Sequence, residues 1–151
     1  MADKYAIEGT ENMASGTPVA ILQMTNVTTH RGLIYDFVIG AEGTMADEVG
    51  TYDVSRFTVA PTDTTVTPRA LDPGSPAALH SDGGENGGTT GTTTANTEVF
   101  NQGIHFRAAF RWVSVPGGEI VLSAVSANGV VWRVSAPTST PITHVSAHFE
   151  D

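Results

Sequence analysis

Residues 104–135, IHFRAAFRWVSVPGGEIVLSAVSANGVVWRVS, decide the fold class of this chain. Three β-rich apolar runs are separated by Pro116-Gly117-Gly118 and by Asn128-Gly129. Asn-Gly tolerates positive φ at both central positions of a tight turn, which matches the twist of paired strands and is a strong hairpin signal. The stretch therefore predicts a three-strand antiparallel meander.

Further apolar runs on both sides of this stretch predict further strands. These runs are residues 18–26, 32–40, 52–60, 64–72, 98–100 and 141–150. Pro68 cannot donate a ladder hydrogen bond, so it confines residues 64–72 to a sheet edge or a bulge. In 32–40 the alternation predicts that Leu33 and Tyr35 share a face with Phe37 and Ile39, with Asp36 on the wetter side. About eight to nine strands without an amphipathic helix predict an all-β fold, an antiparallel β-sandwich of jelly-roll kind.

The 151 residues fit one domain. Residues 1–17 show no clear period and are rich in Gly, Thr, Ser and acids, which predicts a flexible N-terminal arm. We expect residues 18–151 to form a single β-sandwich domain. Within it, residues 73–97 predict a long Gly/Thr-rich loop, well beyond the usual loop length of about 4–6 residues.

Composition restricts the partners. The formal net charge of −9 repels phosphate backbones, so we expect no nucleic acid partner. No stretch approaches the roughly 18 apolar residues that span a bilayer, and the first residues lack the layout of a secretory signal, so we expect a soluble chain made in the cytoplasm with no membrane partner. Cysteine is absent, which excludes disulfides and thiolate metal sites.

Catalytic and nucleotide-binding motifs are also missing. The chain has no G-x-S-x-G elbow, no cysteine and no phosphate-binding glycine motif. Folding could still bring together the carboxylates of Asp36, Asp53 and Glu119, as glycoside hydrolysis requires, but nothing in their spacing selects that arrangement. We therefore expect no enzyme activity and no cofactor.

Metal-binding patterns are weak. His144 and His148 lie on the same face of the last predicted strand, but roughly 13 Å apart along it, too far for one ion. Asp82 and Glu85 lack the alternating acidic spacing that gathers oxygens around calcium. We expect no metal site.

The candidate interface residues are His105, Arg107 and Arg111. In a strand over 104–113 they alternate with apolar side chains, so they would share the polar face. Two interpretations stay open: a basic stripe that binds carboxylates, or a face on which the arginines pair with acids of the same chain. An Arg–carboxylate pair between subunits is an intermediate case.

Aromatic residues leave a carbohydrate-binding module as an alternative function. Trp112, Trp132 and Tyr35 could stack on sugars if they were exposed. The two tryptophans lie in apolar alternation, which is more typical of core positions.

Four segments resemble a family of small structural proteins of tailed bacteriophages. They are YDFVIG at 35–40, TVTPRALDPGSPAAL at 65–79, FRAAFRWVSVPGGEIVLSAVSANGV at 106–130, and the terminal AHFED. The resemblance implies a non-enzymatic virion component on the capsid surface. Within that class, the most plausible role is a decoration or cement protein that bridges subunits of the major capsid protein. A homotrimer would match the local symmetry of a shell. A tail or neck protein is the alternative within the same class.

Overall fold

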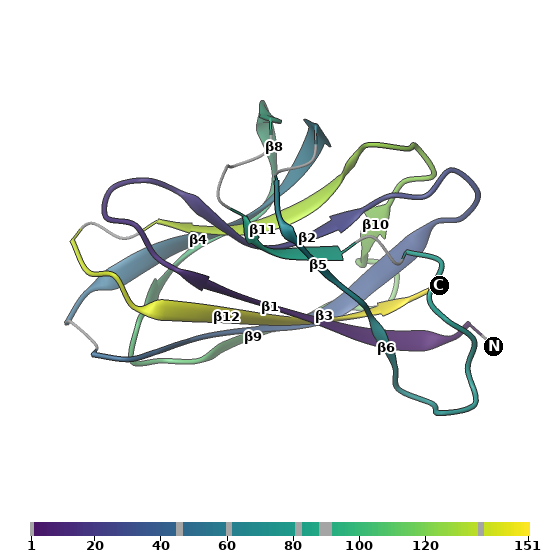
Figure 1. Ribbon diagram of the computed structural model, residues 1–151, viewed down its shortest axis with the longest axis horizontal. Coiled ribbons are helices and arrows are strands. Elements are labelled where there is room, and N and C mark those ends of the chain that lie inside the picture. The colour runs from purple at the N-terminus through teal and green to yellow at the C-terminus, as the bar shows by residue number, and fades with distance from the viewer. Residues whose placement is uncertain (1, 45–46, 60–61, 81–82, 88–91, 136–137) are drawn as a thin grey trace.

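Two antiparallel sheets pack face to face in the computed structural model (Figure 1), which describes residues 2–44, 47–59, 62–80, 83–87, 92–135 and 138–151. These described residues form twelve strands: β1 (Lys4–Asn12), β2 (Val19–Thr25), β3 (Gly32–Glu42), β4 (Val49–Val59), β5 (Thr64–Val66), β6 (Arg69–Ala70), β7 (Gly83–Gly87), β8 (Thr92–His105), β9 (Phe110–Val113), β10 (Ile120–Leu122), β11 (Gly129–Ser135) and β12 (Ile142–Glu150). None of the described residues forms a helix that could cross a membrane.

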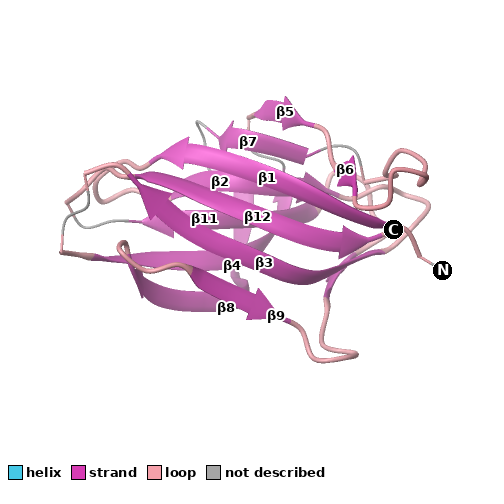
Figure 2. Cartoon of the chain, turned by 90° about the horizontal axis from the view of Figure 1, so that it is seen from below, coloured by secondary structure: helices cyan, strands magenta, loops and turns pink. Residues whose placement is uncertain are grey.

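The strand order is that of a jelly roll. Sheet 1 runs β10-β3-β12-β1-β6, with β9 also paired to β3, and sheet 2 runs β5-β7-β2-β11-β4-β8. Strands from the two halves of the chain pair in nested fashion, β1 with β12 and β2 with β11, which is the arrangement of two Greek keys. Figure 2 shows β1, β12 and β3 in front of the strands of sheet 2. The prediction of an all-β, jelly-roll-like sandwich is confirmed, but the described residues form twelve strands where the sequence predicted about eight to nine. β5, β6 and β7 are an insertion between β4 and β8 that extends both sheets.

The three-strand meander predicted from residues 104–135 is wrong. β9 and β10 do not pair with each other: both lie along the same edge of β3, and β11 belongs to sheet 2 between β2 and β4. Pro116-Gly117 does form a turn, in which the Gly118 N–H donates to the Val115 carbonyl at 2.8 Å and Gly117 has φ of 82°. This is the geometry of a type II turn, and it carries a short excursion out of the edge strand. Asn128-Gly129 forms no hairpin, because it connects two different sheets.

The predicted strand over 104–113 is also interrupted. β8 ends at His105 in sheet 2, residues 106–109 turn, and β9 begins at Phe110 in sheet 1. The alternation continues across the break because Ile104, Phe106 and Trp112 all point toward the space between the sheets. The apolar alternation in the sequence therefore continues through residues 106–109, although the strand ends there.

The N-terminal residues are not a flexible arm. β1 pairs with β12 over its whole length, from Lys4 opposite Glu150 to Asn12 opposite Ile142. Tyr5 and Ile7 are buried, with 2% and 1% of their surface exposed. Their alternation is short and interrupted by Gly9, so the sequence pattern was too weak to indicate a strand that its neighbours stabilise.

The predicted long loop at 73–97 contains regular structure. Gly83–Gly87 is β7, which pairs with β2 and β5, and β8 begins at Thr92. Residues 81–82 and 88–91 of that loop lie outside the described residues. The edge assignment of Pro68 is confirmed, because it lies between β5, an edge strand of sheet 2, and β6, an edge strand of sheet 1.

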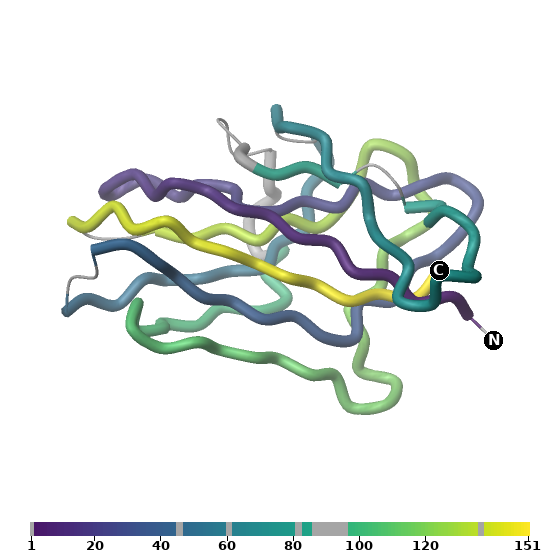
Figure 3. The backbone as a smooth tube through the Cα atoms, turned by 60° about the horizontal axis from the view of Figure 1, so that its bottom comes forward, coloured from purple at the N-terminus to yellow at the C-terminus, as the bar shows by residue number. Residues whose placement is uncertain are grey.

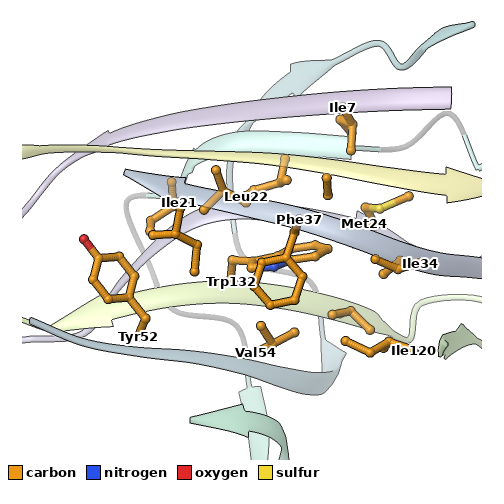
Figure 4. Packing of buried hydrophobic residues seen from close by; sticks show 14 of the residues in the cluster. Ile7, Ile21, Leu22, Met24, Ile34, Phe37, Tyr52, Val54, Ile120 and Trp132 are labelled. Atoms are coloured by element: carbon orange, nitrogen blue, oxygen red, sulfur yellow. The ribbon is translucent and has the colours of Figure 1, made fainter. Parts of the chain in front are cut away.

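The core between the sheets is dominated by aromatic and branched side chains (Figure 4). Phe37 is fully buried and stacks on Trp112 at 5.1 Å between ring centroids, while Trp132 meets it edge-on at 6.0 Å. Offset and edge-to-face pairs of this kind are favourable beyond the area that they bury. Phe37 on β3 thus ties edge strand β9 to central strand β11 of the other sheet.

Candidate interface on the outer face of sheet 1

The two outer faces of the sandwich differ. On sheet 2, Ala20, Phe57 and Val131 form a small cluster of buried side chains on the outer side. On sheet 1, the outward residues of β12, such as His144 and His148, are only partly buried. The outer face of sheet 1 is therefore the more accessible of the two, and it carries Asp36, Arg111, His144 and His148 among the residues that the sequence singled out.

A bulge in β3 places Asp36 on this face. His148 lies opposite Asp36 while the next residue of β12, Phe149, lies opposite Ile34, so the register shifts by one residue at Tyr35. A β-bulge of this kind reverses the alternation along a strand. Ile34 and Phe37 both point into the core, and Tyr35 and Asp36 both lie on the outer side. The predicted common face of Leu33, Tyr35, Phe37 and Ile39 is therefore wrong.

Asp36 is the centre of a hydrogen-bond network across three strands. Arg111 on β9 donates from Nε to Oδ1 at 3.0 Å and from its terminal nitrogen to Oδ2 at 2.7 Å. His148 on β12 places Nδ1 at 3.0 Å from Oδ2. The side chain of Asp36 is 4% exposed, whereas that of Arg111 is 63% exposed. We call Asp36, Arg111 and His148 the Asp36 network.

The network keeps Asp36 ionised. Hydrogen bonds from Arg111 lower the pKa of this carboxyl, burial opposes the shift, and the hydrogen bond with His148 lowers it further. A bidentate guanidinium–carboxylate pair is among the stronger polar interactions because both partners are charged and the geometry is fixed. The centre of the face is therefore an ionised carboxylate at neutral pH, held in a fixed orientation by its partners.

Two further contacts extend the network to β1. Tyr35 stacks on the His148 ring at 6.2 Å between centroids, and Lys4 Nζ lies 5.2 Å from the centre of the Tyr35 ring. Lys4 also pairs with Glu150 at 3.2 Å. Burial raises the pKa of the Tyr35 hydroxyl, so it remains protonated. The outer face is thus cross-linked from β9 through β3 and β12 to β1.

The structure separates the three predicted interface residues. Arg111 belongs to the Asp36 network, which agrees with the interpretation of a pair within the chain. His105 ends β8 in sheet 2, and its Nε2 lies 2.9 Å from Asp47 Oδ1. Arg107 lies in the following turn, 3.9 Å from the same carboxylate. The three do not share one strand face, and their role in an interface remains a prediction.

The sequence analysis missed Asp36 and His148 as members of the site. The sequence does contain an indication of Asp36, because it is the only charged residue in the apolar run 32–40. A charge in such a run needs a partner when it is buried. Which partner it finds depends on strand order, and that order was predicted wrongly here.

The other candidate residues do not gather. Asp36 and Asp53 lie on different sheets, and Asp53 accepts hydrogen bonds from Arg133 at 2.7 and 2.9 Å. Glu119 accepts the Gly117 N–H. His144 contacts Thr10 Oγ1 at 3.0 Å. Within the described ranges, no three His, Cys, Asp or Glu side chains are placed to hold a metal ion. Asp82 lies outside the described residues.

No family model matches the chain, and no curated protein matches it significantly. Among solved structures, one described as "Structure of infectious bursal disease virus Gx strain" is 14% identical over 99% of this chain, with a TM-score of 0.18. The chain spans 38% of that structure's chain. So low a TM-score carries no argument about fold or function.

Proposed function

We propose that this chain is a structural protein of a phage particle that decorates the head and bridges subunits of the major capsid protein. The observation that carries the proposal is the Asp36 network. Its three members come from three of the four segments that resemble phage structural proteins: Asp36 from 35–40, Arg111 from 106–130 and His148 from 147–151. Segments that lie far apart in sequence are thus joined in one surface feature.

The remaining segment of the four, residues 65–79, lies at the same end of sheet 1 as the Asp36 network. Residues 71–80, which we call the strap, curve around the two chain ends (Figure 3). The Asp151 carboxylate accepts the backbone N–H of Leu79 at 2.7 Å and that of His80 at 3.0 Å, and it also pairs with the His80 ring. The Tyr5 hydroxyl donates to the Pro76 carbonyl at 3.0 Å. The strap is therefore held in a defined conformation, with Leu71 and Leu79 exposed on it.

This surface suits a binding role. The Arg111 side chain is largely exposed even though it pairs with Asp36, so its remaining N–H donors are available to a carboxylate on a partner. Exposed Leu71 and Leu79 supply apolar contact at the strap. Specific interfaces typically bury about 1,200–2,000 Å² in total, and three-fold repetition in a homotrimer would multiply such contacts on a shell.

Fold alone does not select this function, because jelly rolls occur in viral capsid and lectin domains alike. For a carbohydrate-binding module, sugar-stacking aromatics need exposure, but Trp132 is 1% exposed and Trp112 stacks inward on Phe37. Tyr35 is half-buried against His148. The geometry therefore favours the virion role over sugar binding.

The test uses purified particles of the phage that encodes this chain, separated into heads and tails and analysed by mass spectrometry. We expect the protein in heads. Its presence only in tails would support the tail or neck alternative, and its absence from both fractions would contradict a virion role. A binding assay with heads that lack the protein then compares R111Q with R31Q. Arg31 is an exposed loop arginine outside both sheets, so only R111Q should weaken binding.

A further inference from the structure

β1 leaves one of its edges largely unpaired. β12 pairs with all of Lys4–Asn12, but on the other side β6 pairs only with Tyr5 and Ala6. Among the described residues, no other strand pairs with this second edge. In an antiparallel strand, alternate residues direct their backbone groups to the same side. The Leu71 N–H donates to the Lys4 carbonyl at 2.8 Å, so the even-numbered residues of β1 point toward the open edge.

Side-chain carboxylates take the place of a neighbouring strand along this edge. The Thr10 N–H donates to Glu85 Oε2 at 3.1 Å, and the Asn12 N–H donates to Glu11 Oε1 at 2.7 Å. Both interactions satisfy donors that would otherwise bond the carbonyls of a paired strand. Exposed edges are commonly blocked by charged side chains in this way, and such a block is reversible because a side chain can rotate away.

A groove runs beside the open edge. It has a volume of about 540 Å³, and its walls are β1 from Ala6 to Thr10 and the crossing segment Thr65–Arg69, with Glu85 at one side. At about 3.3 Å per residue, residues 7–12 offer an edge of roughly 20 Å. An extended segment of a few residues fits beside such an edge.

The charge of the groove determines which kind of segment can bind beside β1. Glu8 and Glu85 line the groove together with one cation, Arg69, and Glu11 lies near enough to Glu85 to add a third negative charge. Burial together with the negative charge of Glu85 raises the pKa of Glu11, despite the opposing Asn12 hydrogen bond. The glutamates outnumber the arginine, so the edge is acidic on balance. Pairing of two copies through this edge would bring two sets of glutamates together. A segment with lysine or arginine at alternate positions would instead neutralise them.

We propose that the open edge of β1 accepts an extended basic segment of a partner protein as an added strand. A carbonyl of the incoming segment takes the Thr10 N–H, and the released Glu85 carboxylate pairs with a basic side chain of that segment. Backbone hydrogen bonds then supply affinity and the alternate side chains supply specificity, as in other cases of strand addition. This inference does not depend on the proposed function.

The test uses an acetylated eight-residue peptide of alternating lysine and threonine, titrated into the full chain and followed by NMR. We expect binding that slows hydrogen exchange at the amides of Glu8, Thr10 and Asn12, while the amides of Ile7 and Glu11, already directed at β12, stay unchanged. A peptide of alternating glutamate and threonine should not bind.

Two variants locate the site. E85K should weaken binding of the basic peptide about tenfold, roughly 1.4 kcal/mol, because it reverses the charge beside Thr10. E98K makes the same change at an exposed position on β8 and should leave binding unchanged. Equal binding of both peptides, equal effects of both variants, binding without protection at the even-numbered amides, or no binding at millimolar peptide would each overturn the proposal.

Discussion

The substitution G9A on β1 tests the packing of the two sheets, because it adds a single methyl group between them. An added Cβ would lie 2.9 Å from Leu22 Cβ and still closer to the Ile21 carbonyl oxygen, both on β2 of the other sheet. Ordinary van der Waals contact begins near 3.4 Å, so the sheets would have to separate locally by about 0.5 Å or more. The obstacle is backbone, which cannot rotate away as a side chain can.

Two opposing effects set the magnitude for G9A. Replacing glycine by alanine within a strand stabilises by about 0.5–1 kcal/mol when space is available. Overpacking of a well-filled interior costs about 1–3 kcal/mol. We expect net destabilisation of roughly 0.5–2 kcal/mol. Gly40 on β3 is the matched control, because an added Cβ there meets nothing within 4 Å. G40A should be neutral or stabilising by up to about 1 kcal/mol.

Urea unfolding of both variants, followed by tryptophan fluorescence, measures the difference. Unchanged m-values would show that the native and denatured states stay comparable, so that the midpoint shift reports stability. If G9A were as stable as G40A, β1 would not pack on β2. Residues 4–12 would then behave as the flexible arm that the sequence predicted, and the correction made from the structure would be refuted.

Three further predictions concern the core, the strap and the turn. F37A should lower the free energy of unfolding by about 3–5 kcal/mol in chemical denaturation, whereas V115A, at a side chain 72% exposed, should change it by under about 0.5 kcal/mol. D151N should cost about 1–3 kcal/mol at pH 7, because it weakens the contacts of the buried His80 ring and of two backbone N–H groups. Burial raises the pKa of Asp151, but the hydrogen bonds from His80 and Leu79 outweigh it and lower the folded-state pKa below the ordinary value. The stabilisation is therefore present above the ordinary pKa of about 4 and is lost as the pH falls through the folded-state pKa. The melting temperatures of wild type and D151N should accordingly converge in acid. Melting temperatures that stayed apart in acid would contradict this role of Asp151. G117V should cost about 1–2 kcal/mol in thermal unfolding, because valine resists the φ of 82° in the type II turn, and no change would mean that the turn adopts another form.

The strand order explains why the predicted interface residues are separated in the structure. The sequence placed Arg107 and Arg111 on one face because a single strand was assumed to run through both. The turn at 106–109 moves the chain from sheet 2 to sheet 1 and leaves each arginine beside a different aspartate, Asp47 or Asp36. Pairing within the chain was one of the two interpretations left open for these arginines. Neither aspartate could be chosen in advance, because both partners are remote in sequence.

Local patterns in the sequence determined which segments are strands and where the chain turns. β2, β3, β4, β11 and β12 lie where the apolar runs predicted them, and Pro116-Gly117 turns because proline presets one backbone angle and glycine accepts the next. Only the tertiary structure decided which strands are neighbours, that residues 4–12 form a strand (β1) at all, and that Asp36 contacts Arg111 and His148. The physical reason is that a period of two fixes which side of a strand is buried, whereas its neighbour depends on long-range packing of the whole sandwich.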